Sequence, residues 1–194
     1  SWLQAYEEGG WLPNWSSPSY QGGMVGTMGD VSFAEAIVDE IPGFDVFKAY
    51  KAIRKNAYKV PPDGVHRVGR VCLESYLKHG YVPPNVKGTV GTCDQAVARS
   101  LSYYQSDFAI AQAAAKLGYA NDATDLLERS KNYSKLFDIK TGVFRSLDQI
   151  GDWTTPVDHT EPGLWQYRFH VPFDVQGLSR LYRRGGHDMC SELN

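Results

Sequence analysis

The sequence predicts an all-α fold in which pairs of helices are joined by irregular loops. Three observations support this fold class. Apolar residues recur at helical spacing along most of the chain, and glycines and prolines fall where these patterns stop. In addition, no stretch alternates apolar and polar residues for long, and no strand–helix–strand order appears. Such helix pairs pack as αα-hairpins, and hairpins arranged in a ring form an α/α toroid whose long loops gather at one end.

The N-terminal half contains three predicted helices. The first covers residues 30–41 and ends at the Pro42-Gly43 pair, which cannot continue a helix. Asp45 is the predicted N-cap of the second helix, whose apolar face extends to about residue 57. The third helix is expected over residues 67–79, and Gly80 provides its C-terminal stop. A loop rich in proline separates the second helix from the third.

The clearest helical pattern lies in the middle of the chain. Thr92 and Gln95 have the spacing of a capping box, and apolar residues then recur in steps of three and four up to residue 115. Gly118 is the predicted end of this helix. A further helix is expected to begin at Asn121 or Asp122 and to keep one apolar face as far as Phe137. The sequence therefore predicts a long helix followed closely by a second one.

A last helix is predicted from Asp174 to the glycines at 185 and 186. The segments 9–20, 81–91 and 142–163 are aromatic and rich in glycine or proline, so they are expected to be the irregular loops. Functional residues favour loops that a rigid scaffold holds in place. These three segments are therefore where a site is expected.

Composition excludes several classes of function. The chain has 194 residues, a net charge of −2 and no basic stripe, which argues against nucleic acid as a partner. No run of eighteen apolar residues is present, so no membrane span is predicted. The three cysteines show neither CxxC nor zinc-ligand spacing, and their odd number leaves at least one without an internal partner. Twelve tyrosines and five tryptophans stand out, since such rings stack on sugars as well as fill cores.

Seven stretches carry a resemblance to a known family. They are YEEGGWLPNW at 6–15, MVGT at 24–27, GFD with AY at 43–50, the segments 101–112 and 129–138, TEPGLWQY at 160–167 and VPFD with GL at 171–178. In this order they resemble segments of the glycoside hydrolase family 92 mannosidases. Each motif alone is weak, but seven in order over nearly the whole chain are strong.

The resemblance implies that residues 1–194 form part of an (α/α)6 toroid, preceded in the family by a β-sandwich domain. It implies calcium-dependent, inverting, exo-acting hydrolysis of α-mannosides in glycans, in a secreted, lumenal or periplasmic setting. It places the catalytic base and most calcium ligands in GNEP and DDxGxM motifs that this chain lacks, so no metal ligand is assigned here. We therefore expect that the natural protein is longer and that the remaining polypeptide, or a partner protein, covers exposed faces of the outer helices.

The resemblance assigns Glu161 as the general acid of this reaction. An inverting glycosidase needs one carboxylic acid that protonates the leaving oxygen and a second carboxylate, roughly 6.5–9.5 Å away, that activates water. Burial beside Trp165 is expected to raise the pKa of such an acid. Gln166, in the same motif, and the tryptophans Trp11 and Trp15 are the remaining candidate substrate-binding residues.

Several departures from the family pattern support an alternative. A family histidine is Met28 here, family acids are Ser102 and Ser106, and a further histidine is Phe173. A pocket that binds hydroxyl groups loses about 1–3 kcal/mol for each polar partner it gives up. The alternative is therefore a catalytically inactive homologue that serves as a glycan-binding or assembly subunit.

Individual candidates also have structural interpretations. Glu161 can act as a carboxylate at a helix start, and Trp11 and Trp15 can be core residues. Asp107 is interpreted as a hydrogen-bonded structural carboxylate, and His159 and His170 as ordinary loop residues. The sequons at Asn14 and Asn132 occur easily by chance, and the first lies inside a family motif.

Overall fold

The computed structural model describes residues 1–15, 20, 24–62, 68–88, 92–154, 158–161 and 163–193. These residues are mainly helical, which confirms the predicted all-α class. The helices are α1 (Trp2–Gly9), α2 (Met28–Val38), α3 (Val46–Tyr58), α4 (Leu73–His79), α5 (Ala96–Lys116), α6 (Ala120–Ser130), α7 (Tyr133–Leu136), α8 (Leu164–Tyr167), α9 (Val175–Arg184) and the 3-10 helix η1 (Ser191–Leu193). Strands β1 (Phe137–Asp138) and β2 (Val143–Phe144) form a small antiparallel hairpin.

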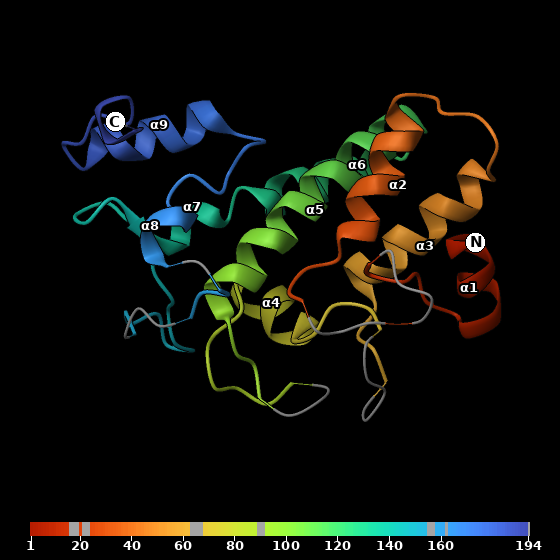
Figure 1. Cartoon of the computed structure of the whole chain (residues 1–194), viewed down its shortest axis with the longest axis horizontal. Coiled ribbons are helices and arrows are strands. Elements are labelled where there is room, and N and C mark those ends of the chain that lie inside the picture. Colours follow the sequence, from red (N-terminus) through yellow and green to blue (C-terminus); the bar gives the residue numbers. More distant parts are fainter. Residues whose placement is uncertain are drawn as a thin grey trace.

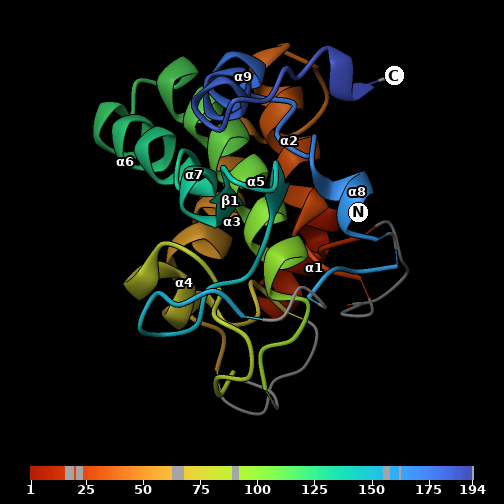
Figure 2. The same cartoon turned by 90° about the vertical axis from the view of Figure 1, so that its left-hand side faces the viewer.

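The long helix α5 is the centre of the structure. It packs against α2, α3, α6 and α7. In Figure 1 the helices α1, α2 and α3 lie on one side of α5, while α7, α8 and α9 lie on the other. The view turned by 90° shows α6 and α2 flanking α5, with the loops gathered below (Figure 2). The helices are thus arranged around one helix that both halves of the chain share.

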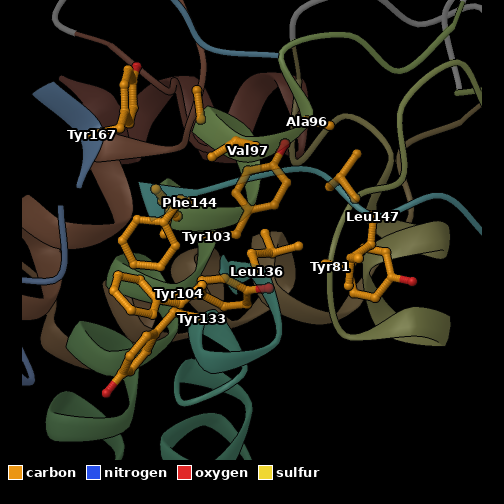
Figure 3. Packing of buried hydrophobic residues seen from close by; sticks show 14 of the residues in the cluster. Tyr81, Ala96, Val97, Tyr103, Tyr104, Tyr133, Leu136, Phe144, Leu147 and Tyr167 are labelled. Carbon is orange, nitrogen blue, oxygen red and sulfur yellow. The ribbon is translucent and has the colours of Figure 1, made fainter. Parts of the chain in front are cut away.

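Two apolar clusters form the core. The first joins α4, the N-terminal half of α5, α7, the hairpin and α9, and Figure 3 shows its ring-rich centre at Tyr103, Tyr104, Tyr133 and Phe144. The second joins α1, α2 and α3 with α6 and the C-terminal half of α5, beginning at Ile110. Between them, in the middle of α5, the buried residues are polar. The two clusters therefore meet at a buried polar layer.

Several predicted helix ends are confirmed. The Asp45 carboxylate accepts a hydrogen bond from Lys48 N at 2.9 Å, and that of Asp174 accepts one from Gly177 N at 2.8 Å, so both are N-caps. Gly80 ends α4 in the left-handed conformation, with φ of 79°. At that φ a side chain is strained, and an added Cβ would also lie 3.0 Å from the Asn132 amide nitrogen.

The predicted third helix is much shorter than expected. It begins at Leu73, because Gly69 and Cys72 adopt left-handed backbone conformations with φ of 58° and 62°. Arg67, where the helix was predicted to start, lies outside the described residues. The non-helical stretch has a use, since it directs the side chain of Arg70 into the interior, where it is completely buried.

The predicted capping box at the start of α5 is wrong. Gln95 is the N-cap residue but has φ of 50° and makes no side-chain cap, and Thr92 instead bridges to Lys87. The next helix begins at Ala120, before the predicted Asn121 or Asp122, and ends at Ser130 rather than continuing to 137. The apolar residues that follow Ser130 in the sequence belong to α7 and β1, whose buried side chains pack on the first cluster.

A disulfide joins Cys72 to Cys93, while Cys190 is exposed and unpaired. The bond fastens the start of α4 to the segment that leads into α5. The prediction of one thiol without an internal partner is confirmed, although the pairing itself was not predicted. No helix in the part of the chain that the structure describes is both long and apolar enough to cross a bilayer.

Candidate active site

The segment that carries Glu161 is fixed to the N-terminal end of α5. Val97 N, one of the amides that a helix start leaves without an intrahelical partner, donates to Asp158 O at 3.2 Å. The Thr160 hydroxyl donates to the Gln95 amide oxygen, and Tyr167 OH donates to Thr160 O at 3.2 Å. Contacts just before α5 and in its first turn therefore fix the position of the segment that carries Glu161.

A further contact secures the same segment. The Ser146 hydroxyl, which follows the β-hairpin, donates to the Asp158 carboxylate at 2.6 Å. Cys93 and its disulfide immediately precede the turn at Gln95. The segment is thus held from three directions: by the start of α5, by the segment after the hairpin and by α8.

Glu161 itself is exposed and has φ of 55°. A left-handed conformation costs a non-glycine residue about 1–2 kcal/mol, and such residues cluster at functional sites. The expected burial of Glu161 beside Trp165 is wrong for the described residues. The reason is that α8 is a four-residue surface helix whose buried side chain is Tyr167, whereas Trp165 is 60% exposed.

Trp165 and Gln166 lie on α8, four and five residues after Glu161 in the chain. Both are exposed, and the Arg168 guanidinium lies 5.4 Å from the centre of the Trp165 ring. An exposed indole and an exposed amide on the segment that follows an exposed acid offer both an apolar face and hydrogen-bonding groups. Three of the five predicted site residues therefore lie exposed on one short segment of the chain.

Trp11 and Trp15 lie elsewhere. Trp11 is 7% exposed and packs against Gly69, with the Lys55 ammonium 4.3 Å from its ring centre. Trp15 is half-buried, and its Nε1 has no hydrogen-bond partner in the described residues. Their neighbourhood follows α1, which Figure 1 shows on the far side of α5 from α8. Asn14, between them, is also buried and donates to Gly69 O at 3.2 Å, so its amide is not open to glycan attachment in this fold.

Asp107 is the centre of the buried polar layer. Its carboxylate accepts hydrogen bonds from Arg70 Nη1 at 2.6 Å, from Arg129 Nε at 2.6 Å and from Tyr76 OH at 2.7 Å. Burial alone would raise the pKa of Asp107, but the two guanidinium groups hold that pKa below its ordinary value. Asp107 is therefore an ionised structural carboxylate, as the sequence analysis interpreted it.

Asp30 is a second buried carboxylate in this layer, and it was not predicted from the sequence. It accepts hydrogen bonds from the Thr27 hydroxyl at 2.6 Å and from Asn56 Nδ2 at 2.8 Å, while Arg70 Nη2 is 3.5 Å away. Burial raises the pKa of Asp30 to about 6, against the lowering effect of Arg70 and the hydrogen bonds. The available signal was its place among apolar positions of a predicted helix.

Three of the positions that depart from the family pattern, Met28, Ser102 and Ser106, lie together. Thr27 Oγ1 is 3.4 Å from Ser106 Oγ, and Gly26 lies so close to Ser102 that an added Cβ would be 2.9 Å from the Cβ of that serine. Met28 begins α2 at the same place. The substituted histidine and acids therefore map to one region, where the start of α2 meets α5.

The histidines near Glu161 flank an aromatic ring. His159 and His170 lie 5.0 and 5.4 Å from Tyr167, centre to centre, and burial lowers the pKa of His170. In the described part of the chain no three His, Cys, Asp or Glu side chains are grouped so that they can hold a metal ion.

A family model described as the Glycosyl hydrolase family 92 catalytic domain matches residues 1–194, the whole chain. The chain belongs to glycoside hydrolase family 92. This membership agrees with the resemblance that the seven motifs carry. The helix hairpins therefore form part of the α/α toroid of family 92 catalytic domains.

Solved family 92 structures share this fold. A family GH92 α-mannosidase from Bacteroides thetaiotaomicron in complex with mannoimidazole is 32% identical, with a TM-score of 0.79, over 95% of this chain and 26% of that one. A family GH92 inverting mannosidase from Bacteroides thetaiotaomicron VPI-5482 is 30% identical, with a TM-score of 0.82, over 93% of this chain and 25% of that one. An uncharacterized secreted glycosidase from Arthroderma benhamiae is 27% identical over 92% of this chain and 27% of its own length. The chain thus spans about a quarter of these family 92 relatives.

Proposed function

We propose that this chain belongs to an inverting exo-α-mannosidase that acts on mannose-containing glycans, with Glu161 as the general acid. The observation that carries the proposal is the local arrangement of Glu161, Trp165 and Gln166. They lie on one exposed segment that the start of α5 holds in place, in a chain of a glycosidase family. Both solved relatives described above are titled mannosidases.

In this proposal Glu161 donates its proton to the leaving oxygen as the glycosidic bond breaks. A carboxylate supplied by residues other than these 194 removes a proton from the attacking water. Trp165 offers an apolar face to the sugar, and Gln166 offers a donor and an acceptor to its hydroxyls. Calcium rests on the family alone, and its ligands are expected outside the described residues.

The exposure of Glu161 bears on how the acid functions. A general acid works best when its pKa lies near the working pH, which requires that its surroundings disfavour the charged form. Within this chain α8 is open to solvent. We therefore expect the remaining polypeptide to close over Glu161 and Trp165 and to complete the site.

The test uses the full-length protein in calcium-containing buffer with two substrates. Glu161→Gln should lower hydrolysis of a methyl α-mannoside about 10²–10⁴-fold, because its leaving oxygen needs a proton. The same variant should lose little activity on a dinitrophenyl α-mannoside, whose leaving group departs unprotonated. Glu128→Gln, an exposed glutamate of α6, is the matched control and should leave both rates unchanged.

The outcomes separate the proposals. Equal losses on both substrates would mean that Glu161 is needed for structure or binding and is not the acid. An unchanged rate on the methyl glycoside would remove Glu161 from the mechanism altogether. Absence of any calcium-dependent turnover by the wild-type protein would favour the second candidate function.

That second candidate is an inactive family 92 homologue that binds glycans or serves in an assembly. A specific observation favours it: Met28, Ser102 and Ser106 replace family polar residues at one place, where α2 meets α5. When the replaced polar residues lie in one region, a whole set of polar contacts is lost from that region. Replacements scattered over the fold would not have this effect. Binding of a mannoside without turnover is the result that this candidate predicts.

We also propose a secreted, lumenal or periplasmic setting. One relative is named as secreted, and the Cys72–Cys93 disulfide is of the kind that persists in oxidising compartments. Detection of the intact disulfide by mass spectrometry of the native protein would support this. Recovery of both thiols in reduced form from cells would contradict it.

A further inference from the structure

We propose that a second carbohydrate-binding site lies at the C-terminal end of α5, in an open pocket between α3 and the start of α6. The pocket has a volume of about 630 Å³ and is lined mainly by Tyr50, Lys51, Arg54, Tyr119, Asn121 and Asp122. Its size falls within the range of small-ligand sites, about 300–1,000 Å³. The ligand class is a neutral pyranoside, and the site is independent of the catalytic proposal.

The aromatic part of the pocket is a stacked pair of tyrosines. The rings of Tyr50 and Tyr119 lie 4.5 Å apart at an interplanar angle of 3°. Tyr50 is 2% exposed, whereas Tyr119 is 41% exposed. Tyr119 therefore covers Tyr50 with one face and turns the other towards solvent. A flat exposed ring of this kind suits the apolar C–H face of a pyranose.

Polar groups with fixed geometry border this ring. The Asp122 carboxylate accepts from Tyr50 OH at 2.7 Å and from Arg54 Nη2 at 2.9 Å, so both side chains are held in place before any ligand arrives. Hydrogen bonds to Asp122 lower its pKa, which keeps it an acceptor at neutral pH. Lys51 and Asn121 are exposed and add donors and an amide oxygen. Sugar hydroxyls need both kinds of partner.

The arginine of the pocket is already paired with a carboxylate, which argues against a phosphate or carboxylate ligand. Asp122 is paired with Arg54, which leaves the Lys51 ammonium as the remaining charge of the pocket. A site built for phosphate or carboxylate would be expected to keep its arginine available for bidentate contacts. Here the guanidinium is already engaged, so its remaining N–H groups serve as ordinary donors. The combination of one bare ring and ordered hydrogen-bonding groups is typical of sugar recognition.

The backbone turn makes the platform rigid. Gly118 has φ of 82°, Gly118 N donates to Ala115 O at 3.2 Å, and Tyr119 N donates to Ala114 O at 2.8 Å. These bonds close the end of α5 in a Schellman-type arrangement. Tyr119 is therefore placed by the turn and not by the ligand, which reduces the entropy lost on binding.

The site lies far from Glu161. The Thr160–Gln95 contact is at the first turn of α5, and Tyr119 follows its last turn. The helix has 21 residues, which corresponds to a length of about 32 Å at 1.5 Å per residue. Figure 1 shows the α5–α6 turn at the opposite end of α5 from α4 and the loops. A sugar bound there is therefore separate from the one that Glu161 would protonate.

The test uses the full-length protein with 3-fluorotyrosine in place of tyrosine, observed by fluorine NMR. The Tyr119 resonance is assigned by its loss in Tyr119→Phe. Methyl α-mannoside should shift this resonance saturably in the millimolar range, where a single monosaccharide contact is expected to bind. The shift should persist when the protein also carries Glu161→Gln, so failure of the catalytic proposal does not affect this result.

Controls make the outcome decisive. Tyr119→Phe keeps the aromatic ring, so this variant should retain the saturation-transfer signals of sugar bound at this site. Tyr119→Ala removes the ring and should lose these signals. Tyr133, whose ring is buried in the first core cluster, should show no shift. An unmoved Tyr119 resonance at saturating sugar would overturn the proposal. A response to inorganic phosphate but not to the neutral sugar would overturn it as well.

Discussion

The buried polar layer offers a direct test of how the two core clusters are joined. Asp107→Asn keeps the shape of the side chain but removes the charge that faces Arg70 and Arg129. Arg70 is completely buried, and among the residues that the structure describes it would keep only Asp30, 3.5 Å away, as a carboxylate partner. Breaking a buried ion pair by removing one partner costs about 3–5 kcal/mol. Since whole domains are stable by about 5–15 kcal/mol, this is a large share.

Asp30→Asn is the matched comparison in the same layer. The fold disfavours the charged form of Asp30 relative to the unfolded chain, because burial raises the pKa of Asp30 to about 6. The amide therefore replaces a group whose charge the fold disfavours, and the expected cost is below about 1.5 kcal/mol, the value of one hydrogen bond to Thr27 or Asn56. Two aspartates that contact the same arginine are thus predicted to differ at least twofold in their effect.

Urea unfolding of both variants at pH 7, followed by circular dichroism, measures this difference. The slope of free energy against urea should stay constant, because neither change alters the surface exposed on unfolding. Equal destabilisation by the two substitutions would refute the assignment of Asp107 as the carboxylate whose charge the fold stabilises. A loss below about 1 kcal/mol for Asp107→Asn would show that the layer contributes little to stability.

Two further predictions concern pH and the disulfide. Because the folded-state pKa of Asp30 exceeds its ordinary value, its contribution to stability is complete at low pH and is lost as the pH rises through about 6. Acidification from pH 7 to 5 should therefore add roughly 1 kcal/mol of stability from this group. Urea titrations at the two pH values should show that Asp30→Asn gains less stability on acidification than the wild-type protein. Replacement of Cys72 and Cys93 by serine opens a loop of 21 residues and should cost about 3 kcal/mol. A reductant should lower wild-type stability by the same amount and leave the double variant unchanged.

The sequence predicted the helical elements well wherever local chemistry decides the structure. Asp45 and Asp174 cap their helices, and Gly80 ends another, because each forms its bond or its φ within a few residues. The family could also be identified, since the order of short motifs survives even where single residues change. The fold class and the membership of the family could therefore be predicted from the sequence.

The failures have a common physical cause, which is competition from distant partners. Gln95 has the right spacing for a capping box, but its amide oxygen accepts from Thr160, 65 positions away. Arg70 lies in an apparent helical pattern, but the backbone unwinds so that its guanidinium reaches Asp107 and Asp30. Such choices depend on tertiary contacts and cannot be read from local periodicity.

The candidate site was predicted in part. Trp165 and Gln166 lie on the segment of Glu161 because all three belong to one motif, whereas Trp11 belongs to another motif that folds into the interior. Aromatic content alone did not distinguish a ring that stacks on sugar from one that fills a core. Burial separates the two tryptophans, because Trp11 is 7% exposed and Trp165 is 60% exposed.

The left-handed backbone at Glu161 has a consequence for how this position changes over evolution. Glycine or asparagine would adopt φ of 55° at lower cost, so random substitution that preserves only folding should favour them over glutamate. A lineage that no longer needed the carboxylate would gain stability by drifting to either residue. The sequence of each further homologue is therefore an independent trial: glutamate kept against this conformational bias indicates selection for its chemistry, and glycine or asparagine indicates that selection has been relaxed.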